Sequence, residues 1–564
     1  MSVRWFIKLS EVAPAPSAGY WRRLPADWQG KGPGGEPQAG RTWVRRRKSN
    51  MKSWFKPYKH QASFIKQTTS LKPGKGIIAA HGTGTGKTIS SVAAFEELKK
   101  QGKASRALVI APAGLRNNYL KKGVEKFTNS KGLIVKNADQ EIPDDVDYVI
   151  TSYAAFRKNP DAFLKNYLPD TIIADEMHRA TNQSSSTHKA LYRAAEVVPR
   201  FMGLTASIAQ NDPSDIASAV RIATAGQAPD TVTNKKKFRK KYTKKVPTKQ
   251  KGVFGGKVHE KRVIRGDELR KELGATIHYL EDLDADKKPR KETQRVAVKM
   301  SKTQVKLYRE AMKGLDPKVR AKIAAGEPVS QKEAMHVFTK LLHARQVSNS
   351  LHAHVPKMSL EQAAEATPKI KKILDDVDEH IKSTSDSQVI IYTNIVKGGV
   401  DVIEAGLKKR GVAYGVFSGK GNKGVTEESR QQAVEDYQAG KNKVIVITGA
   451  GAEGLDLGNT TMVMLADGHY NPQRVAQAEA RGIRAKGQSH RPKEKRKVIV
   501  RQYVSTIPRN FFEKMLFRDP EKSVGEWVYA TAERKARANR QLRNVLENKP
   551  KKKERTLLHR MFGS

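Results

Sequence analysis

The sequence contains no cysteine, which excludes disulfide bonds and cysteine-ligated zinc fingers. It also lacks any run of about 18 apolar residues, the length that a helix needs to cross a bilayer. Its first residues contain no apolar core of a secretory signal. These absences argue against a helical membrane protein and a disulfide-rich secreted domain. We expect a cytoplasmic protein that is not secreted and has no membrane partner.

Acidic residues are scarce relative to basic ones. The 564 residues include 106 Lys plus Arg but only 57 Asp plus Glu, a formal net charge of +49. A charge of this size predicts a polyanionic partner, and nucleic acid is the obvious one. A surface made basic only for solubility is the poorer explanation, because excess positive charge promotes non-specific nucleic-acid binding.

A glycine-rich loop lies between a predicted strand and a predicted helix. The apolar residues 76–80 form the strand, residues 81–88 (HGTGTGKT) form the loop, and helical periodicity follows. In this context, backbone N–H groups and a helix N-terminus surround phosphate oxygens. We predict that ATP binds here, with Lys87 on the outer phosphates and the Thr88 hydroxyl on Mg²⁺. The nucleotide-binding residues of the loop are Gly82, Thr83, Gly84, Thr85, Gly86, Lys87 and Thr88.

One residue departs from the general loop pattern, because His81 stands where the first glycine is usual. A glycine-rich turn with an incidental lysine is the alternative to a phosphate loop. The strand before the loop and the helix after it disfavour that alternative.

A second apolar strand, predicted at residues 171–174, ends in the adjacent carboxylates of Asp175 and Glu176. Open α/β sheets bind their ligands at this end of their strands. We predict that Asp175 holds Mg²⁺ and that Glu176 orients or deprotonates the attacking water. A solvated Asp-Glu pair is the alternative, disfavoured downstream of a phosphate loop. His178 is either part of this site or a hydrogen-bonding loop residue.

A third motif lies about three hundred residues further along. Gln477, Arg481 and Arg484 are spaced so that one helix face presents all three. The guanidinium fork stabilises charge on a transferring phosphoryl group, so Arg481 and Arg484 are predicted to be catalytic. A basic, solvated helix face is the alternative. The order of the three motifs favours an NTP-driven motor.

These motifs resemble those of superfamily 2 helicase-type ATPases, and in particular of the SNF2-like DNA translocases. The further matching segments are PYKHQ at 57–61, LVIAPAGLRNNY at 108–119, VITSYAAF at 149–156, GLTASI at 203–208, QVIIYTN at 388–394, TGAGAEGLDL at 448–457 and NPQRVAQAEARGIR at 471–484. Residues 287–312 resemble the SNF2 pattern of a charged linker, a strand and a serine-capped helix. The phosphate loop and the DEMH motif at 175–178 are similar to those of virus-encoded members. This similarity suggests a protein of viral or phage origin that acts in the cytoplasm of a host cell.

The resemblance implies further roles. Gln61 would contact the adenine, and Gly454 and Asp456 would contribute to the nucleotide site. The residues expected to couple hydrolysis to movement are His178, Thr205, Ser207 and Gln477. Ser152 would contact a nucleic-acid phosphate, although such hydroxyls also cap helices. The basic segment adds the expected nucleic-acid contacts Lys235, Lys236, Lys237, Arg239, Lys240 and Lys241.

The expected fold is α/β, with two RecA-like lobes whose parallel sheets carry helices on both faces. The Pro/Gly/Arg-rich residues 1–50 form an arm, either disordered, a small accessory module or a passive tail. Residues 51–222 form lobe 1 and residues 365–507 form lobe 2. A basic, largely helical insertion spans 223–364, and a basic helical extension spans 508–564.

Three functions are compatible with these features. The favoured one is a DNA-stimulated ATPase that uses ATP and Mg²⁺ to translocate on or remodel double-stranded DNA. The second is a strand-separating helicase on DNA or RNA, which needs a wedge element that the sequence does not reveal. The third is a DNA-binding module with a degenerate ATPase. This alternative is disfavoured by the intact Lys87, Asp175, Glu176, Arg481 and Arg484. The sequence predicts no particular protein partner.

Overall fold

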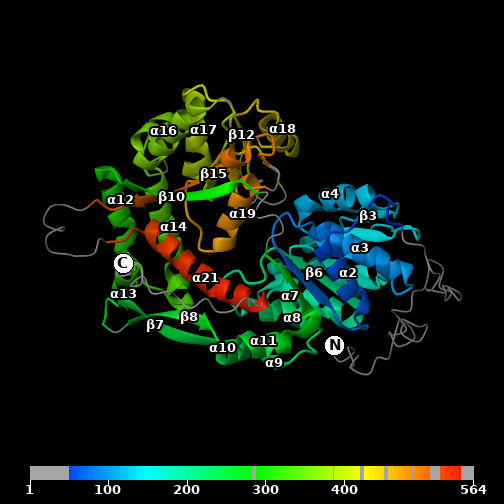
Figure 1. The fold of residues 1–564 in the computed structure, drawn as a ribbon. Coiled ribbons are helices and arrows are strands. Elements are labelled where there is room, and N and C mark those ends of the chain that lie inside the picture. The colour runs from blue at the N-terminus through cyan, green and yellow to red at the C-terminus, as the bar shows by residue number, and fades with distance from the viewer. Residues whose placement is uncertain are drawn as a thin grey trace, which may run out of the picture. The chain divides into compact units, whose positions relative to one another are not determined.

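The computed structural model describes residues 50–255, 257–281, 288–352, 354–384, 386–419, 425–449, 455, 457–484, 487–508 and 521–547. Residues 1–49 of the expected arm lie outside this set. The chain splits into two compact units (Figure 1). Unit 1 comprises residues 1–244, 261–283 and 538–564, and unit 2 comprises residues 245–260 and 284–537.

Unit 1 contains a seven-stranded sheet in the order β3-β4-β2-β5-β6-β1-β9. Every recorded strand pair in it is parallel. The strands are β1 (Ile77–His81), β2 (Ala107–Ala111), β3 (Gly132–Ile134), β4 (Tyr148–Ser152), β5 (Thr171–Ala174), β6 (Arg200–Thr205) and β9 (Ile277–Leu280). The inner strands are continuous apolar runs, as expected of a parallel sheet buried on both faces.

Alternate residues of these strands face two separate cores. Ile77 and Ala79 of β1 pack in the core that contains Phe64 and Phe95. Ile78 and Ala80 pack in the core on the opposite face. The helices of unit 1 are α2 (Lys59–Ser70), α3 (Lys87–Lys100), α4 (Arg116–Tyr119), α5 (Tyr153–Lys158), α6 (Pro160–Tyr167), α7 (Ser186–Val197), α8 (Asp215–Ala223), α9 (Asp230–Thr233), α10 (Lys235–Tyr242) and α11 (Gly266–Leu273).

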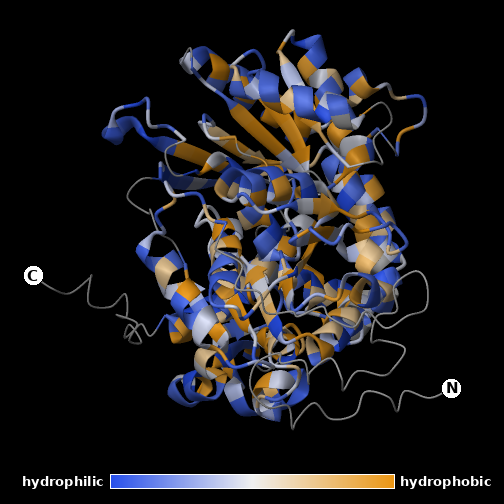
Figure 2. Ribbon diagram, turned by 90° about the vertical axis from the view of Figure 1, so that its right-hand side faces the viewer, coloured by the Kyte–Doolittle hydropathy of each residue, from blue (hydrophilic) through white to orange (hydrophobic). Residues whose placement is uncertain are grey.

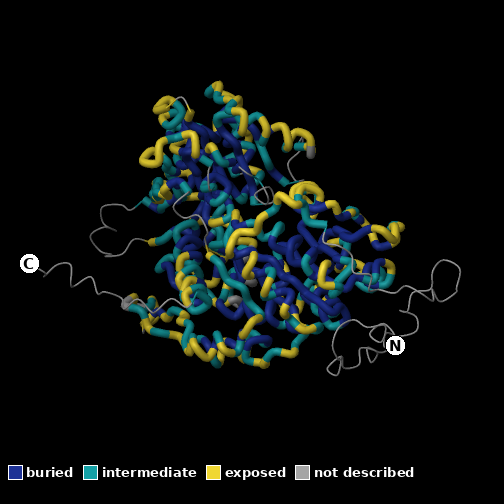
Figure 3. The backbone as a smooth tube through the Cα atoms, turned by 45° about the vertical axis from the view of Figure 1, so that its right-hand side comes forward, coloured by how far each residue is buried: buried dark blue, intermediate teal, exposed yellow. Residues whose placement is uncertain are grey.

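Unit 2 contains a six-stranded parallel sheet in the order β10-β15-β14-β11-β13-β12. Its strands are β10 (Arg290–Lys299), β11 (Val389–Thr393), β12 (Tyr414–Phe417), β13 (Val444–Thr448), β14 (Met462–Leu465) and β15 (Lys497–Thr506). A separate two-stranded sheet is formed by β7 (Thr243–Lys251) and β8 (Lys257–Val263). The inner strands β11, β13 and β14 are apolar and buried, whereas many helix residues are hydrophilic and exposed (Figures 2 and 3).

Helices cover both faces of the second sheet as well. Val389 and Ile391 of β11 face one core, while Ile390 and Tyr392 face another. The helices of unit 2 are α12 (Lys302–Lys313), α13 (Pro317–Ala324), α14 (Gln331–Asn349), α15 (Leu360–Ala366), α16 (Pro368–Ser383), α17 (Asp401–Lys409), α18 (Glu427–Gln438), α19 (Pro472–Gly482) and α21 (Val524–Leu546), of which the last residues, from Ala538 on, belong to unit 1. The expected α/β fold with two helix-flanked parallel sheets is therefore confirmed.

The segment between the two large sheets is not purely helical. β9 pairs with β1 and extends the first sheet, and β10 pairs with β15 over ten residues of the second. The compact units meet at 244/245, 260/261, 283/284 and 537/538. The expected strand and serine-capped helix are present as β10 and α12, where the Ser301 hydroxyl accepts from the Gln304 N–H at 3.2 Å. Among the described residues, no helix is long and apolar enough to cross a membrane.

Candidate nucleotide site

The glycine-rich loop connects the end of β1 to the start of α3. Gly84 and Gly86 have φ angles of +79° and +78°, a left-handed conformation that glycine adopts without strain. At Gly82 a Cβ atom would lie 1.9 Å from the Glu281 carbonyl oxygen, so the loop needs glycine there for space. No side chain caps the N-terminus of α3. Its first turn therefore presents backbone N–H groups suited to an anion.

Lys87 folds back over the loop. Its ammonium donates to the carbonyl oxygens of His81 at 3.1 Å and Gly82 at 3.0 Å. The Thr85 hydroxyl also donates to the Gly82 carbonyl, at 2.8 Å. These bonds hold the cation beside the loop, which is where the outer phosphates of a nucleotide would be neutralised.

The start of α2 supports the loop from one side. Gln61 is 2 % exposed, and its side-chain oxygen accepts from the Tyr58 N–H at 2.9 Å. Its amide nitrogen is next to Gly86, because a Cβ built there would lie 2.8 Å from it. The His60 ring contacts the Thr85 carbonyl oxygen at 2.9 Å. The structure thus places Gln61 beside the phosphate loop.

The unusual His81 is accounted for by its neighbours. Its ring is fully buried, and its Nε2 lies 2.7 Å from Nδ1 of His278, which β9 places next to β1. Burial, followed by the charges of His278 and Lys87, lowers the pKa of His81 to about 3. A neutral histidine thus fills the space beside the loop. Sequence reasoning missed His278 because its strand is short and lies some two hundred residues away.

The acidic pair follows β5 directly. Asp175 is 7 % exposed, its carboxylate accepts the Glu176 N–H at 3.1 Å, and its carbonyl accepts the Tyr153 hydroxyl at 2.6 Å. Burial and then the charge of Glu176 raise the pKa of Asp175 to about 7, while Lys87 opposes the rise. A divalent cation would offset the same repulsion. The oxygen donors Asp175 and Thr88 suit a hard cation such as Mg²⁺.

His178 lies between the carboxylate of Glu176 and the end of β6. The His178 Nδ1 lies 3.1 Å from a carboxylate oxygen of Glu176 and 3.2 Å from the Thr205 hydroxyl. The Thr205 hydroxyl donates to the Ser207 carbonyl at 2.9 Å and accepts the Ser207 N–H at 3.0 Å. Glu176 itself has a φ of +52°, a strained conformation for a residue other than glycine. The structure therefore brings Glu176, His178, Thr205 and Ser207 together in one chain of close polar contacts, in which Glu176 is partly exposed and the other three residues are buried.

This chain continues to a residue near the C-terminus. The Ser207 hydroxyl donates to the Ala209 carbonyl at 3.1 Å. Asn539, in the part of α21 that belongs to unit 1, donates its amide to the carbonyls of Ala209 and Gln210 at 3.0 and 3.1 Å. Asn539 is 2 % exposed. Nothing in the pattern of a basic helix distinguishes this asparagine, so sequence reasoning missed it.

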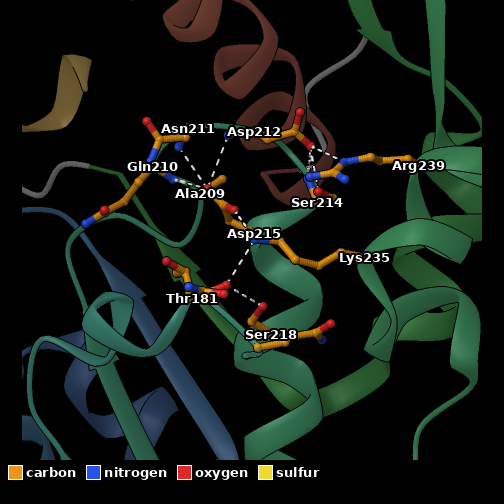
Figure 4. A network of polar contacts seen from close by, with 12 residues as sticks. Thr181, Ala209, Gln210, Asn211, Asp212, Ser214, Asp215, Ser218, Lys235 and Arg239 are labelled. Carbon is orange, nitrogen blue, oxygen red and sulfur yellow. Dashed lines mark hydrogen bonds and ion pairs between the residues drawn. The ribbon is translucent and has the colours of Figure 1, made fainter. Parts of the chain in front are cut away.

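Asp215 holds the loop that follows Ser207 (Figure 4). One carboxylate oxygen accepts the backbone N–H groups of residues 210–212 at 3.2, 2.8 and 3.1 Å. The other accepts the Lys235 ammonium at 2.5 Å, and Lys235 also donates to the Thr181 carbonyl at 3.0 Å. Lys235 thus joins the segments that follow the acidic pair and β6.

Most of the expected nucleic-acid contacts have internal partners. Ser152 is 8 % exposed and caps α5 by accepting the Ala155 N–H at 3.1 Å. In α10 the ion pairs are Lys235 with Asp215, Lys237 with Asp230, Arg239 with Asp212, and Lys241 with Glu268 and Glu272. Lys236 and Lys240 are exposed. Lys237 and Arg239 are exposed as well, but each forms an ion pair, whereas no ion pair of Lys236 or Lys240 is recorded among the described residues.

The paired arginines lie in unit 2. Arg481 is in the last turn of α19, and Arg484 follows the helix end at Gly482, so the helix does not carry both. Both guanidinium groups nevertheless donate to one acceptor, the Leu455 carbonyl, at 3.3 and 2.6 Å. Gln477 lies one turn before Arg481 in the same helix. The predicted nucleotide contacts Gly454 and Asp456 lie outside the described residues.

Two family models match the chain. The SNF2-related domain matches residues 1–353, more than half of the 564 residues. The helicase conserved C-terminal domain matches residues 369–486. The first span contains the phosphate loop and the acidic pair, and the second contains α19. Together they include every motif on which the resemblance rests.

Proteins from several kinds of organism are similar to this chain. L538 of Acanthamoeba polyphaga mimivirus, whose name describes an ATP-dependent RNA helicase, is 23 % identical over 445 residues, covering 78 % of this chain and 88 % of that protein. The uncharacterized ATP-dependent helicase YqhH of Bacillus subtilis is 23 % identical over 441 residues, covering 75 % of this chain and 72 % of that protein. The ISWI chromatin-remodeling complex ATPase ISW1 of Saccharomyces cerevisiae is 24 % identical over 494 residues, covering 83 % of this chain but 40 % of that protein.

A solved structure also aligns with the chain. It is the Sulfolobus solfataricus SWI2/SNF2 ATPase core in complex with dsDNA, which is 19 % identical and has a TM-score of 0.36. The alignment covers 88 % of this chain and 98 % of that one.

Proposed function

The chain belongs to the SNF2-related family of helicase-type ATP hydrolases, and on that premise we propose that it uses ATP hydrolysis to move along or remodel double-stranded DNA. The formal net charge of +49 supports a polyanionic track. The sequence of β10 and α12, which resembles the SNF2 pattern, supports a duplex in preference to a single strand.

The observation that carries the proposal is the chain of close polar contacts from the acidic pair to the loop after β6. A carboxylate that contacts the attacking water is linked through His178 to Thr205 and Ser207. A rearrangement at Glu176 during hydrolysis would therefore change the bonds that hold residues 207–212.

We assign the chemical roles as follows. Lys87 neutralises charge on the outer phosphates, and Gln61 contacts the adenine. Thr88 and Asp175 are the residues that would hold Mg²⁺, which would polarise the transferred phosphoryl group. Glu176 accepts a proton from the attacking water, and its 3.1 Å contact with His178 orients the carboxylate for this purpose.

Arg481 and Arg484 are proposed to stabilise charge on the transferred phosphoryl group. Their shared contact with the Leu455 carbonyl supports this role, because it holds two guanidinium groups side by side. We expect Gln477, His178, Thr205 and Ser207 to act in coupling. Phosphate contacts by the α10 segment are proposed chiefly for Lys236 and Lys240.

The test compares ATP hydrolysis with closed duplex DNA, single-stranded DNA and RNA as stimulators. We expect the largest stimulation with duplex DNA. In a second assay, the wild-type protein and ATP should displace a triplex-forming third strand, whereas the Glu176→Gln variant should not. Equal stimulation by RNA, or efficient separation of a forked duplex without displacement of the third strand, would favour the strand-separating helicase instead.

A further inference from the structure

The β7–β8 hairpin ends in an apolar tip that is exposed to solvent. Residues 252–255 form its turn, closed by a bond from the Gly255 N–H to the Gly252 carbonyl at 3.1 Å. Between these glycines, Val253 is 46 % exposed and Phe254 is 61 % exposed. Turns of this kind are ordinarily built from Gly, Asn, Asp, Ser or Pro. A Val-Phe pair at the tip therefore has no explanation in turn geometry.

The tip is held in place within unit 2. The Val253 N–H donates to the Glu327 carboxylate, which is largely buried. The side chain of Gln250 donates to the Ala325 carbonyl at 3.1 Å. The short segment that receives these bonds is itself fixed, because Trp527 donates its indole N–H to the Glu327 carbonyl at 2.7 Å. The anchoring uses the backbone of Val253 and leaves the Phe254 ring outside.

Large exposed apolar side chains are rare elsewhere in the described part of the chain. Apart from the tip, they are Trp54, Tyr58 and Leu342. Trp54 packs against Phe127 with ring centroids 5.3 Å apart. Val253 and Phe254 are the two that are adjacent in sequence. Their position at the end of a projecting hairpin makes them available to a partner.

The arms of the same hairpin are cationic. Lys245 and Lys257 are exposed, one on each strand. Gly326, beside the anchoring carboxylate, receives a bond from the Arg534 guanidinium at 2.7 Å. An apolar aromatic tip between basic arms matches the chemistry of nucleic acid, which offers phosphates for the ammonium groups and base faces for the ring. A partner with an acidic but non-aromatic surface would leave the ring without a use.

We propose that the β7–β8 tip engages a DNA duplex by inserting Phe254 against the base stack while lysines of the arms contact the phosphates. Apolar wedges of this kind unstack a base step and kink the duplex. The inference rests on the proposed function only in taking DNA as the substrate. This wedge kinks an intact duplex and does not separate its strands, so it differs from the wedge element that a strand-separating helicase needs.

The experiment uses the full chain and a duplex that carries 2-aminopurine at one step, whose fluorescence rises when the base is unstacked. Wild-type protein should raise the fluorescence, and Phe254→Ala should abolish the rise and weaken duplex binding about tenfold, as expected for the loss of one base–aromatic stack. Phe254→Trp keeps a stacking ring and should retain both properties. Leu342→Ala, which truncates an exposed apolar side chain of α14 in unit 2, is the matched control and should behave as wild type.

The outcomes separate this inference from the proposed function. If duplex DNA stimulates ATP hydrolysis but Phe254→Ala matches wild type in fluorescence and affinity, the wedge is refuted and the motor stands. If the fluorescence rises without any duplex-stimulated hydrolysis, the wedge stands and the proposed function fails. ATP hydrolysis without DNA should be equal in all four proteins, because Phe254 is not part of the nucleotide site. A loss of this basal hydrolysis in Phe254→Ala would show that the variant misfolds. The test then rests on Phe254→Trp, and a loss of the fluorescence rise in this variant would refute the wedge.

Discussion

Replacing Asp215 by asparagine tests whether its carboxylate holds the loop after β6. Asparagine keeps the size of the side chain and one oxygen for the N–H groups of residues 210–212, but it removes the charge that pairs with Lys235. The two side chains are 6 % and 21 % exposed, so this pair is mostly desolvated. Removing one partner of a buried pair costs about 3–5 kcal/mol. The residual exposure of Lys235 and its bond to Thr181 place our expectation at the lower end, about 3 kcal/mol.

The measurement is urea unfolding of the full chain, followed by circular dichroism. In Asp215→Asn the free energy of unfolding should fall by this amount, and the double variant Asp215→Asn/Lys235→Met should recover at least about 1 kcal/mol, because it removes the stranded charge. Lys236→Met, at an exposed position on the same helix, is the control and should change stability by less than about 0.5 kcal/mol. A change that small in Asp215→Asn itself would refute the reasoning.

Four further predictions concern catalysis. Lys87→Ala should lose both binding of a fluorescent ATP analogue and ATP hydrolysis. Glu176→Gln should keep binding of the analogue, while its kcat falls by about 10²- to 10⁴-fold. A wild-type kcat in Glu176→Gln would contradict the role of Glu176 in accepting a proton from water. Arg481→Ala should lower kcat without weakening binding of the analogue, and an unchanged kcat would remove this arginine from the reaction. Asn539→Ala should lower kcat with little change in KM, and Asn539→Gln should restore part of it; equal rates in all three proteins would show that the bonds to the loop after Ser207 do not matter for turnover. The pKa of Asp175 is raised from 3.8 to about 7, so between these pH values the native protein holds a proton that the unfolded chain has lost. Without Mg²⁺, the free energy of unfolding should therefore decrease as the pH rises from about 4 to about 7. Asp175→Asn should remove this pH dependence, and an unchanged pH dependence would identify another group as its cause.

The nucleotide half of the site could be predicted because its information is local. Residues 81–88 carry the loop conformation, the lysine and the hydroxyl in one stretch, between a buried strand and a helix. Asp175 and Glu176 follow an apolar strand in the same way. Burial on both faces makes the inner strands continuous apolar runs, so β5 begins and ends at the predicted residues 171–174.

The paired arginines show where a local pattern stops being informative. Their spacing predicted one helix face, but α19 ends at Gly482, before Arg484. The two side chains converge because the Leu455 carbonyl lies within reach of both. A helical repeat describes residues only while the helix lasts, and the position of a carbonyl from another segment has no signature in sequence.

Amino-acid sequence by itself determined the family, the ATP chemistry and the two parallel sheets, because each depends on short motifs or on the apolar pattern of single strands. Tertiary structure alone decided which basic residues are available to a partner. Lys235, Lys237, Arg239 and Lys241 are indistinguishable from Lys236 and Lys240 in composition, yet the first group is paired with carboxylates that the fold brings near. It also decided that the Phe254 ring is exposed at a hairpin tip. Pairing and exposure depend on contacts between residues distant in the chain, and such contacts form only when the chain has folded.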